Sequence, residues 1–169
     1  MSRGFVKEDD QEETPLVPPR ADLPSGVTNY VTPQGKAELP AEREELIHER
    51  ENLKIADEKE QRIAVNFIHA KLQLLNQRIA TAHVIDLKEQ PKDEIRFGAT
   101  VFFRIGSEKK IQRFQIVGVD EADVKKKKIA FTSPLARALI NKKVGETAVL
   151  RLPAGERQFH ITAIDYQAE

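Results

Sequence analysis

Apolar residues between positions 58 and 82 recur at alternating spacings of three and four, which predicts an amphipathic helix with a heptad repeat. The stripe consists of Val65, Ile68, Leu72, Leu75, Ile79 and Ala82. An earlier stretch places leucines at 39, 46 and 53, but its alternate positions are charged, so this second stripe is only half apolar. Since neither helix can bury its stripe alone, the pattern predicts an antiparallel coiled-coil hairpin over residues 30–86.

The first arm of this hairpin carries helix start signals. Thr32 can cap the helix, and Pro33 fits the first helical position, where the missing N–H costs nothing. Pro40 lies inside the same arm, where a proline removes a hydrogen bond and costs roughly 3 kcal/mol. We therefore expect the first arm to kink or restart at Pro40, and the second arm to begin near Glu58.

Residues 1–29 combine an acidic cluster with several prolines, a composition that favours extended backbone and predicts a disordered tail. A short docking segment around Leu16 to Pro19 is the alternative. Residues 87–94 lose the helical period and include Pro91, so we expect them to link the hairpin to a second unit.

From residue 95 onward the pattern changes to short runs rich in Val, Ile, Phe and Thr, separated by turn residues. Five runs are strand candidates: ATVFFRI, IQRFQIVGV, KIAFTS, TAVLRL and RQFHITAIDY. Between the third and the fourth, Ser133, Pro134 and Gly145 mark the cap, the first turn and the end of a short helix. The sequence thus predicts an α+β fold, in which the helical hairpin precedes an antiparallel sheet with one helix packed on it.

Composition narrows the functional classes. The 169 residues include 27 basic and 27 acidic side chains, so the net charge gives no general attraction to nucleic acid. The chain has no cysteine and its four histidines lack metal-ligand spacing, so we expect no stable metal site of its own. No apolar run reaches the roughly 20 residues of a membrane helix, and the N-terminus lacks a signal-peptide pattern, so a cytoplasmic location without membrane contact is expected.

Several segments resemble, in order and spacing, the C-terminal half of the bacterial Gre transcript-cleavage factors GreA and GreB. These segments are VIDLKEQPKDEIRFGATV, FQIVGVDEAD, SPLARALINKKVGETAVLRLPAGE and AIDY, and NYVTPQGKAEL is similar to the start of the family's N-terminal hairpin. The resemblance implies an FKBP-like domain over residues 87–169 that docks at the rim of the RNA polymerase secondary channel, with the hairpin directed toward the active centre. It also implies that the protein is not an enzyme and at most stimulates RNA cleavage by the polymerase.

The hairpin tip carries the candidate site residues Asp57, Glu58 and Glu60. Asp57 and Glu60 reproduce the Asp-x-x-Glu spacing with which the family helps to hold a second Mg²⁺ at the polymerase active centre, and carboxylates are natural ligands of that ion. The resemblance thus implies no cofactor owned by this chain, but a Mg²⁺ shared with the polymerase. The ordinary alternative is an exposed turn whose acids favour the following helix N-terminus.

The length of the hairpin bears on this activity. It is about 15 residues shorter than the family pattern, a loss of roughly 10 to 12 Å in reach, so cleavage stimulation is expected to be weak or absent. Occupation of the channel would then remain as the mechanism.

The same resemblance places polymerase binding around Thr132, Ser133, Pro134 and Arg137. Thr132 stands where family members often carry Asp, which removes one charge from the expected contact. The nearby run Lys125 to Lys128 suits either a solvated turn or a patch attracted to an acidic surface.

Three alternatives stay open at this point. A regulator like Rnk would bind the polymerase without cleavage, and a coiled-coil scaffold would pair its half-polar stripe with other proteins. A peptidyl-prolyl isomerase shares the FKBP fold, but its apolar pocket is commonly floored by Trp, and this chain has no Trp and two Tyr. The leading prediction is a monomeric regulator that binds RNA polymerase and contacts RNA only indirectly.

Overall fold

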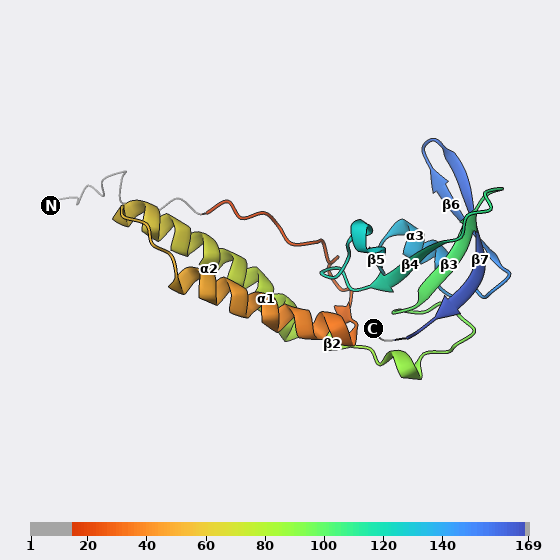
Figure 1. Ribbon diagram of the computed structural model, residues 1–169, viewed down its shortest axis with the longest axis horizontal. Coiled ribbons are helices and arrows are strands. Elements are labelled where there is room, and N and C mark those ends of the chain that lie inside the picture. Colours follow the sequence, from red (N-terminus) through yellow and green to blue (C-terminus); the bar gives the residue numbers. More distant parts are fainter. Residues whose placement is uncertain (1–14, 168–169) are drawn as a thin grey trace.

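The computed structural model describes residues 15–167, which form two units (Figure 1). Two long helices, α1 (Pro33–Glu51) and α2 (Glu58–Thr81), project away from a curled sheet that carries the short helix α3 (Pro134–Leu139). The chain therefore mixes helices and strands, with the long helices first, as the sequence predicted. Within the described residues, no helix combines the length and the apolar character needed to cross a membrane.

α1 begins where its capping signals predicted. Thr32 has extended backbone, and its side chain accepts a hydrogen bond from the backbone N–H of Gly35 at 3.1 Å. Pro33 follows as the first helical residue, where its fixed φ suits the helix and its missing N–H is not needed.

Pro40 lies inside α1, and the helix continues unbroken past it to Glu51. Of the two outcomes expected at Pro40, a kink or a restart, the restart is therefore wrong. A proline removes one backbone hydrogen bond from the helix, at a cost of roughly 3 kcal/mol. Packing offsets this cost, because the adjacent Leu39 is buried in one cluster with Leu75 of α2 and holds this turn in helical form.

The apolar stripe predicted for α2 is buried against α1. Ile68, Leu72 and Leu75 are its buried residues, and Leu46 of α1 packs on the same cluster as Leu75. The two helices run antiparallel, because residues 52–57 join their neighbouring ends (Figure 1). Each helix thus supplies the surface that the other needs.

Two short strands close the base of the helix pair. β1 (Tyr30–Val31) precedes α1 and pairs in parallel with β2 (His83–Val84), which follows α2. The sequence did not predict this pairing, because two-residue strands are too short to show alternation. The pairing holds the chain that enters α1 beside the chain that leaves α2.

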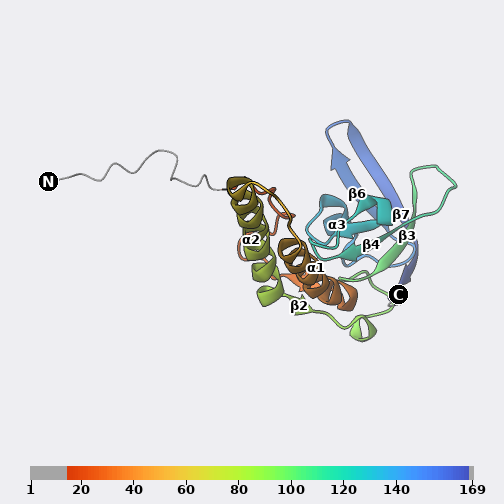
Figure 2. The same ribbon diagram turned by 60° about the vertical axis from the view of Figure 1, so that its left-hand side comes forward.

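The second unit contains the five strands that the sequence predicted. They are β3 (Thr100–Ile105), β4 (Gln112–Val117), β5 (Lys128–Ala130), β6 (Thr147–Leu152) and β7 (Gly155–Asp165). Their order in the sheet is β5-β4-β3-β7-β6. The outer end of β6 and the start of β7 form an exposed arm that extends beyond the rest of the sheet in both views (Figure 1 and Figure 2).

One edge of this sheet differs from the prediction. β5 pairs with β4 in parallel, so the expectation of a wholly antiparallel sheet is wrong. Residues 118–127 separate the two strands and include the short 3-10 helix η3 (Val124–Lys126). This connection is long enough to carry the chain back along β4 before β5 begins, which a tight hairpin turn could not do.

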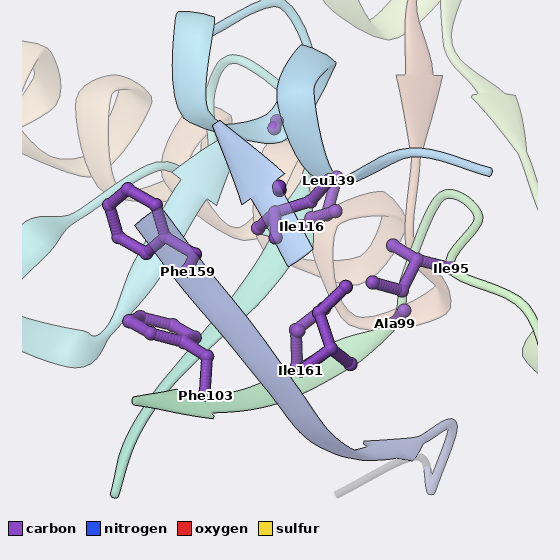
Figure 3. Packing of buried hydrophobic residues seen from close by; sticks show 10 residues of the cluster. Ile95, Ala99, Phe103, Ile116, Leu139, Phe159 and Ile161 are labelled. Carbon is purple, nitrogen blue, oxygen red and sulfur yellow. The ribbon is translucent and has the colours of Figure 1, made fainter. Parts of the chain in front are cut away.

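The core of the sheet unit is distinct from that of the helix pair. Figure 3 shows its packing, in which Phe159 of β7 lies edge-on to Phe103 of β3 with ring centroids 5.3 Å apart. The buried cluster comprises Ile95, Ala99, Val101, Phe103, Ile116, Ala136, Leu139, Phe159 and Ile161, with Ala148. All of these residues follow position 94, so each unit has its own apolar interior.

The stretch that joins the two units is held to the sheet. It contains a short 3-10 helix, η2 (Leu87–Glu89), in which Leu87 is buried. Gly98 has a φ of +88°, and a Cβ built there would lie 2.0 Å from Leu87 Cδ2. Glycine at this position therefore serves both the backbone conformation and the close approach of Leu87.

Residues 15–29, which precede β1, lie beside the helix pair (Figure 1). Within it, Arg20 forms ion pairs with one residue of each unit, Glu42 of α1 and Asp120 of the sheet unit. The sequence predicted a disordered tail over residues 1–29, of which residues 1–14 lie outside the described residues.

Candidate functional site

The tip of the helix pair lies at the end farthest from the sheet (Figure 1). It holds the three predicted site residues Asp57, Glu58 and Glu60, all of them exposed. Asp57 is the N-cap of α2, and its carboxylate accepts a hydrogen bond from the backbone N–H of Glu60 at 3.4 Å. Glu58 and Glu60 lie in the first turn, where the helix dipole favours negative charge. The three acids therefore help to start α2, whatever else they do.

Gln61 holds the connection between the helices onto α2. Its Oε1 accepts a hydrogen bond from the backbone N–H of Ile55 at 3.2 Å, and its Nε2 donates to the carbonyl of Leu53 at 3.4 Å. Because both ends of the amide are used, the turn that carries the acids is tied to the helix. Sequence reasoning missed this role, since a single glutamine beside acidic residues forms no pattern.

The tip alone offers too few ligands for a metal ion. Residues 15–167 contain no group of three or more acidic, His or Cys side chains that could hold one ion. Mg²⁺ prefers about six oxygen ligands in octahedral geometry, of which Asp57 and Glu60 would supply a minority. The tip can therefore present carboxylates to an ion that is held elsewhere.

The second group of predicted site residues lies at the start of α3. Ser133 is the N-cap, and its hydroxyl accepts a hydrogen bond from the backbone N–H of Ala136 at 3.3 Å. Pro134 follows as the first helical residue, as the sequence predicted. Pro134 and Arg137 are exposed, while Thr132 is half-buried. The structure thus brings these four residues together at the start of α3, in the loop that enters this helix and its first turns, and so places them in the sheet unit, apart from the acidic tip.

An aromatic cluster lies next to this loop, where the base of the helix pair meets the sheet unit. The ring of Phe131 lies 5.7 Å from that of Tyr30 in β1 and 5.6 Å from that of Phe97, centroid to centroid. A pocket of about 400 Å³ opens beside the three rings. Sequence reasoning missed this cluster because its rings come from three separate segments of the chain.

Glu121 connects the sheet unit to the first turn of α1. Its buried carboxylate accepts hydrogen bonds from the backbone N–H groups of Thr32 (3.1 Å) and Gly118 (3.0 Å), and also from the hydroxyl of Thr32. A carboxylate in this position is stabilised by the dipole of α1. Gly35 leaves the space for it, since a Cβ on Gly35 would lie 2.2 Å from Glu121 Cδ. The contact between Glu121 and the start of α1 therefore helps to set the direction of the helix pair, and no sequence pattern predicted it.

Comparison with known proteins identifies the sheet unit. The family described as "Transcription elongation factor, GreA/GreB, C-term" matches residues 90–166, which span the whole five-stranded sheet and α3. Residues 90–166 are therefore a C-terminal domain of the GreA/GreB type. Transcription elongation factor GreA of Hyphomonas neptunium is 41% identical over 102 residues, which cover 60% of this chain and 65% of that protein. GreA of Pelobacter propionicus is 40% identical over 102 residues, covering 60% and 64%. The chain thus matches less than two thirds of the length of these curated GreA relatives.

Solved structures of the GreA/GreB group are also similar to this chain. The GreA factor homolog Gfh1 of Thermus thermophilus is 23% identical with a TM-score of 0.39, covering 82% of this chain and 99% of that one. A GreA/GreB factor from Nitrosomonas europaea is 20% identical with a TM-score of 0.41, covering 81% and 98%. TM-scores this low do not establish a shared arrangement of the two units.

Proposed function

We propose that this protein is a transcription elongation regulator of the Gre type that binds bacterial RNA polymerase. The match of residues 90–166 to the GreA/GreB C-terminal family carries this proposal. The curated relatives are named transcription elongation factors, which supports the same process for this chain. In this proposal the protein is not an enzyme, and it acts by changing what the polymerase does.

The two units have separate tasks in this proposal. The sheet unit, as an FKBP-like domain, docks on the polymerase through the loop from Thr132 to Arg137, and the helix pair enters the secondary channel as a coiled-coil hairpin. Two features support this division. The exposed side chains of Pro134 and Arg137 lie on α3, whose first turn is fixed by the Ser133 cap. The helix pair extends away from the sheet, so its tip is free to reach a second position (Figure 1).

The acidic tip acts mainly by its presence and its charge in this proposal. Asp57 already serves as the cap of α2, and α1 has 19 residues. A helix of that size is roughly 28 Å long, which limits how far the tip can reach from the docked sheet. A Mg²⁺ at the tip would be shared with the polymerase, with Asp57 and Glu60 as its ligands from this chain. Cleavage stimulation is therefore proposed to be weak, and channel occupation to be the main effect.

Binding to purified bacterial RNA polymerase tests the docking surface. Reversing the charge of Arg137 with Arg137→Glu is expected to weaken binding about tenfold or more, equivalent to about 1.4 kcal/mol. Arg157→Glu is the matched control, because Arg157 is also exposed but lies on β7 within the projecting arm. Equal affinities for the wild type and Arg137→Glu would refute the proposed docking loop, and no binding by the wild type would refute the proposed function.

A further inference from the structure

The segment from Val17 to Ala21 touches both units of the protein. It runs beside the helix pair toward the base of that pair (Figure 1). Together with Leu46 and Leu74 of the two helices and Val119 of the sheet unit, it lines a groove of about 380 Å³. This segment lies well outside residues 90–166, so the GreA/GreB match does not explain it.

Arg20 makes the strongest contacts of this segment. Its two terminal nitrogens donate to the two carboxylate oxygens of Glu42 on α1, at 2.7 and 3.0 Å. Its Nε donates to Oδ1 of Asp120 in the sheet unit, at 3.0 Å. This is the bidentate geometry that suits a planar guanidinium, and here a single side chain joins the two units.

Arg78 of α2 completes the network. It donates to the second oxygen of Asp120 at 3.3 Å and to the backbone carbonyl of Ala21 at 2.6 Å. Two arginines thus meet two carboxylates, so the charges balance, and the side chain of Asp120 is only 5% exposed. The hydrogen bond to Glu42 raises the pKa of Arg20 above its ordinary value, so Arg20 stays charged at any physiological pH. Partly buried pairs of this kind are screened less by salt than surface pairs.

Because this network contacts α1 well beyond its first turn, it restrains the direction in which the helix pair points. Glu121 holds Thr32, Asp120 holds Arg78 of α2, and Phe131 packs on Tyr30, but these contacts all lie at the base of the helix pair and resist its tilting only weakly. Glu42 lies roughly 15 Å further along α1. Opening the contacts of Glu42 by about 2 Å corresponds to a rotation of about 8°, which moves the tip, roughly 30 Å from Thr32, by about 4 Å.

We infer that residues 17–21 form a strap that fixes the direction of the helix pair relative to the sheet unit, with Arg20 as the residue that closes it. With the strap closed, the tip has one position relative to the docking loop. With the strap open, the helix pair tilts about the contacts at its base, which include that between Thr32 and Glu121. This inference does not depend on polymerase binding.

Distances between two spin labels in the full-length protein test the strap. The chain has no cysteine, so Lys59→Cys at the tip and Lys143→Cys in the sheet unit give two unique labelling sites, and both lysines are exposed. Pulsed electron resonance then gives the distribution of tip-to-sheet distances. We expect a narrow distribution with the native strap, and a distribution broadened or shifted by about 4 Å or more in Arg20→Glu.

Two further variants make the result decisive. A full-length variant with a Gly-Ser sequence in place of residues 17–21 removes the strap without changing either unit, and it is expected to behave as Arg20→Glu does. Asp22→Lys reverses a charge on the same segment at an exposed residue, and it is expected to keep the narrow distribution. Circular dichroism of each variant verifies that the helices are intact. A broad distribution with the native strap, unchanged distances in both strap variants, or equal broadening in Asp22→Lys would each overturn the inference.

Discussion

Gly35→Ala is a change for which helix propensity and tertiary packing predict opposite signs. Inside an exposed helix, replacing glycine by alanine stabilises by up to about 1 kcal/mol. In α1 the new Cβ would lie 2.2 Å from Cδ and 2.5 Å from Oε2 of Glu121, far inside van der Waals contact. Either α1 or the carboxylate of Glu121 must therefore shift when Gly35 is replaced by alanine.

Glu121 would have to move, and its hydrogen bonds decide the magnitude. The carboxylate accepts from the backbone N–H groups of Thr32 and Gly118 and from the Thr32 hydroxyl. Hydrogen bonds to charged groups contribute about 1.5 to 3 kcal/mol each, so losing even one outweighs the gain in propensity. We expect Gly35→Ala to lower the free energy of unfolding by about 1 to 3 kcal/mol.

A double-mutant cycle isolates this contact. Urea unfolding followed by circular dichroism would be measured for the wild type, Gly35→Ala, Glu121→Ala and the double variant. With Glu121 shortened to alanine the clash is absent, so Gly35→Ala should then be neutral or stabilising, and the coupling should be roughly 2 kcal/mol or more. If Gly35→Ala stabilises the protein that retains Glu121, the reasoning is refuted.

Three further changes test other parts of the structure. Tyr166→Phe should cost about 1 to 3 kcal/mol in urea unfolding, because the Tyr166 hydroxyl accepts from the Arg96 backbone N–H at 2.7 Å and donates to the Glu94 carbonyl; an unchanged midpoint would contradict this. The fragment 87–167 should melt cooperatively, because it contains the whole buried cluster of the sheet unit, and a melt without a transition would show that the units share a core. In a backtracked elongation complex, the wild type and the Asp57→Ala, Glu60→Ala double variant should give similarly weak RNA cleavage, and strong cleavage that disappears in the double variant would make the protein a full transcript-cleavage factor.

The sequence alone determined the features that depend on near neighbours in the chain. The start of α1 was predicted from Thr32 and Pro33, and the structure confirms it. The start of α3 was predicted in the same way from Ser133 and Pro134, and it is confirmed too. Capping depends on a side chain and a backbone group a few residues apart, so it can be read locally. The heptad stripe of α2 and the five strand runs were predicted for the same reason, since periodicity is a property of one segment.

Only the tertiary structure decided the features that depend on segments far apart in the chain, such as strand direction and long-range side-chain contacts. β5 runs parallel to β4 because of where residues 118–127 lead, and α1 passes through Pro40 because α2 supplies a partner for its buried face. The contacts of Arg20 and Glu121 join residues about 90 to 100 positions apart. Charged side chains such as these are common on any surface, so their types carry no signal until the fold brings their partners within hydrogen-bond distance. The direction of the acidic tip therefore rests on contacts that only the folded chain creates.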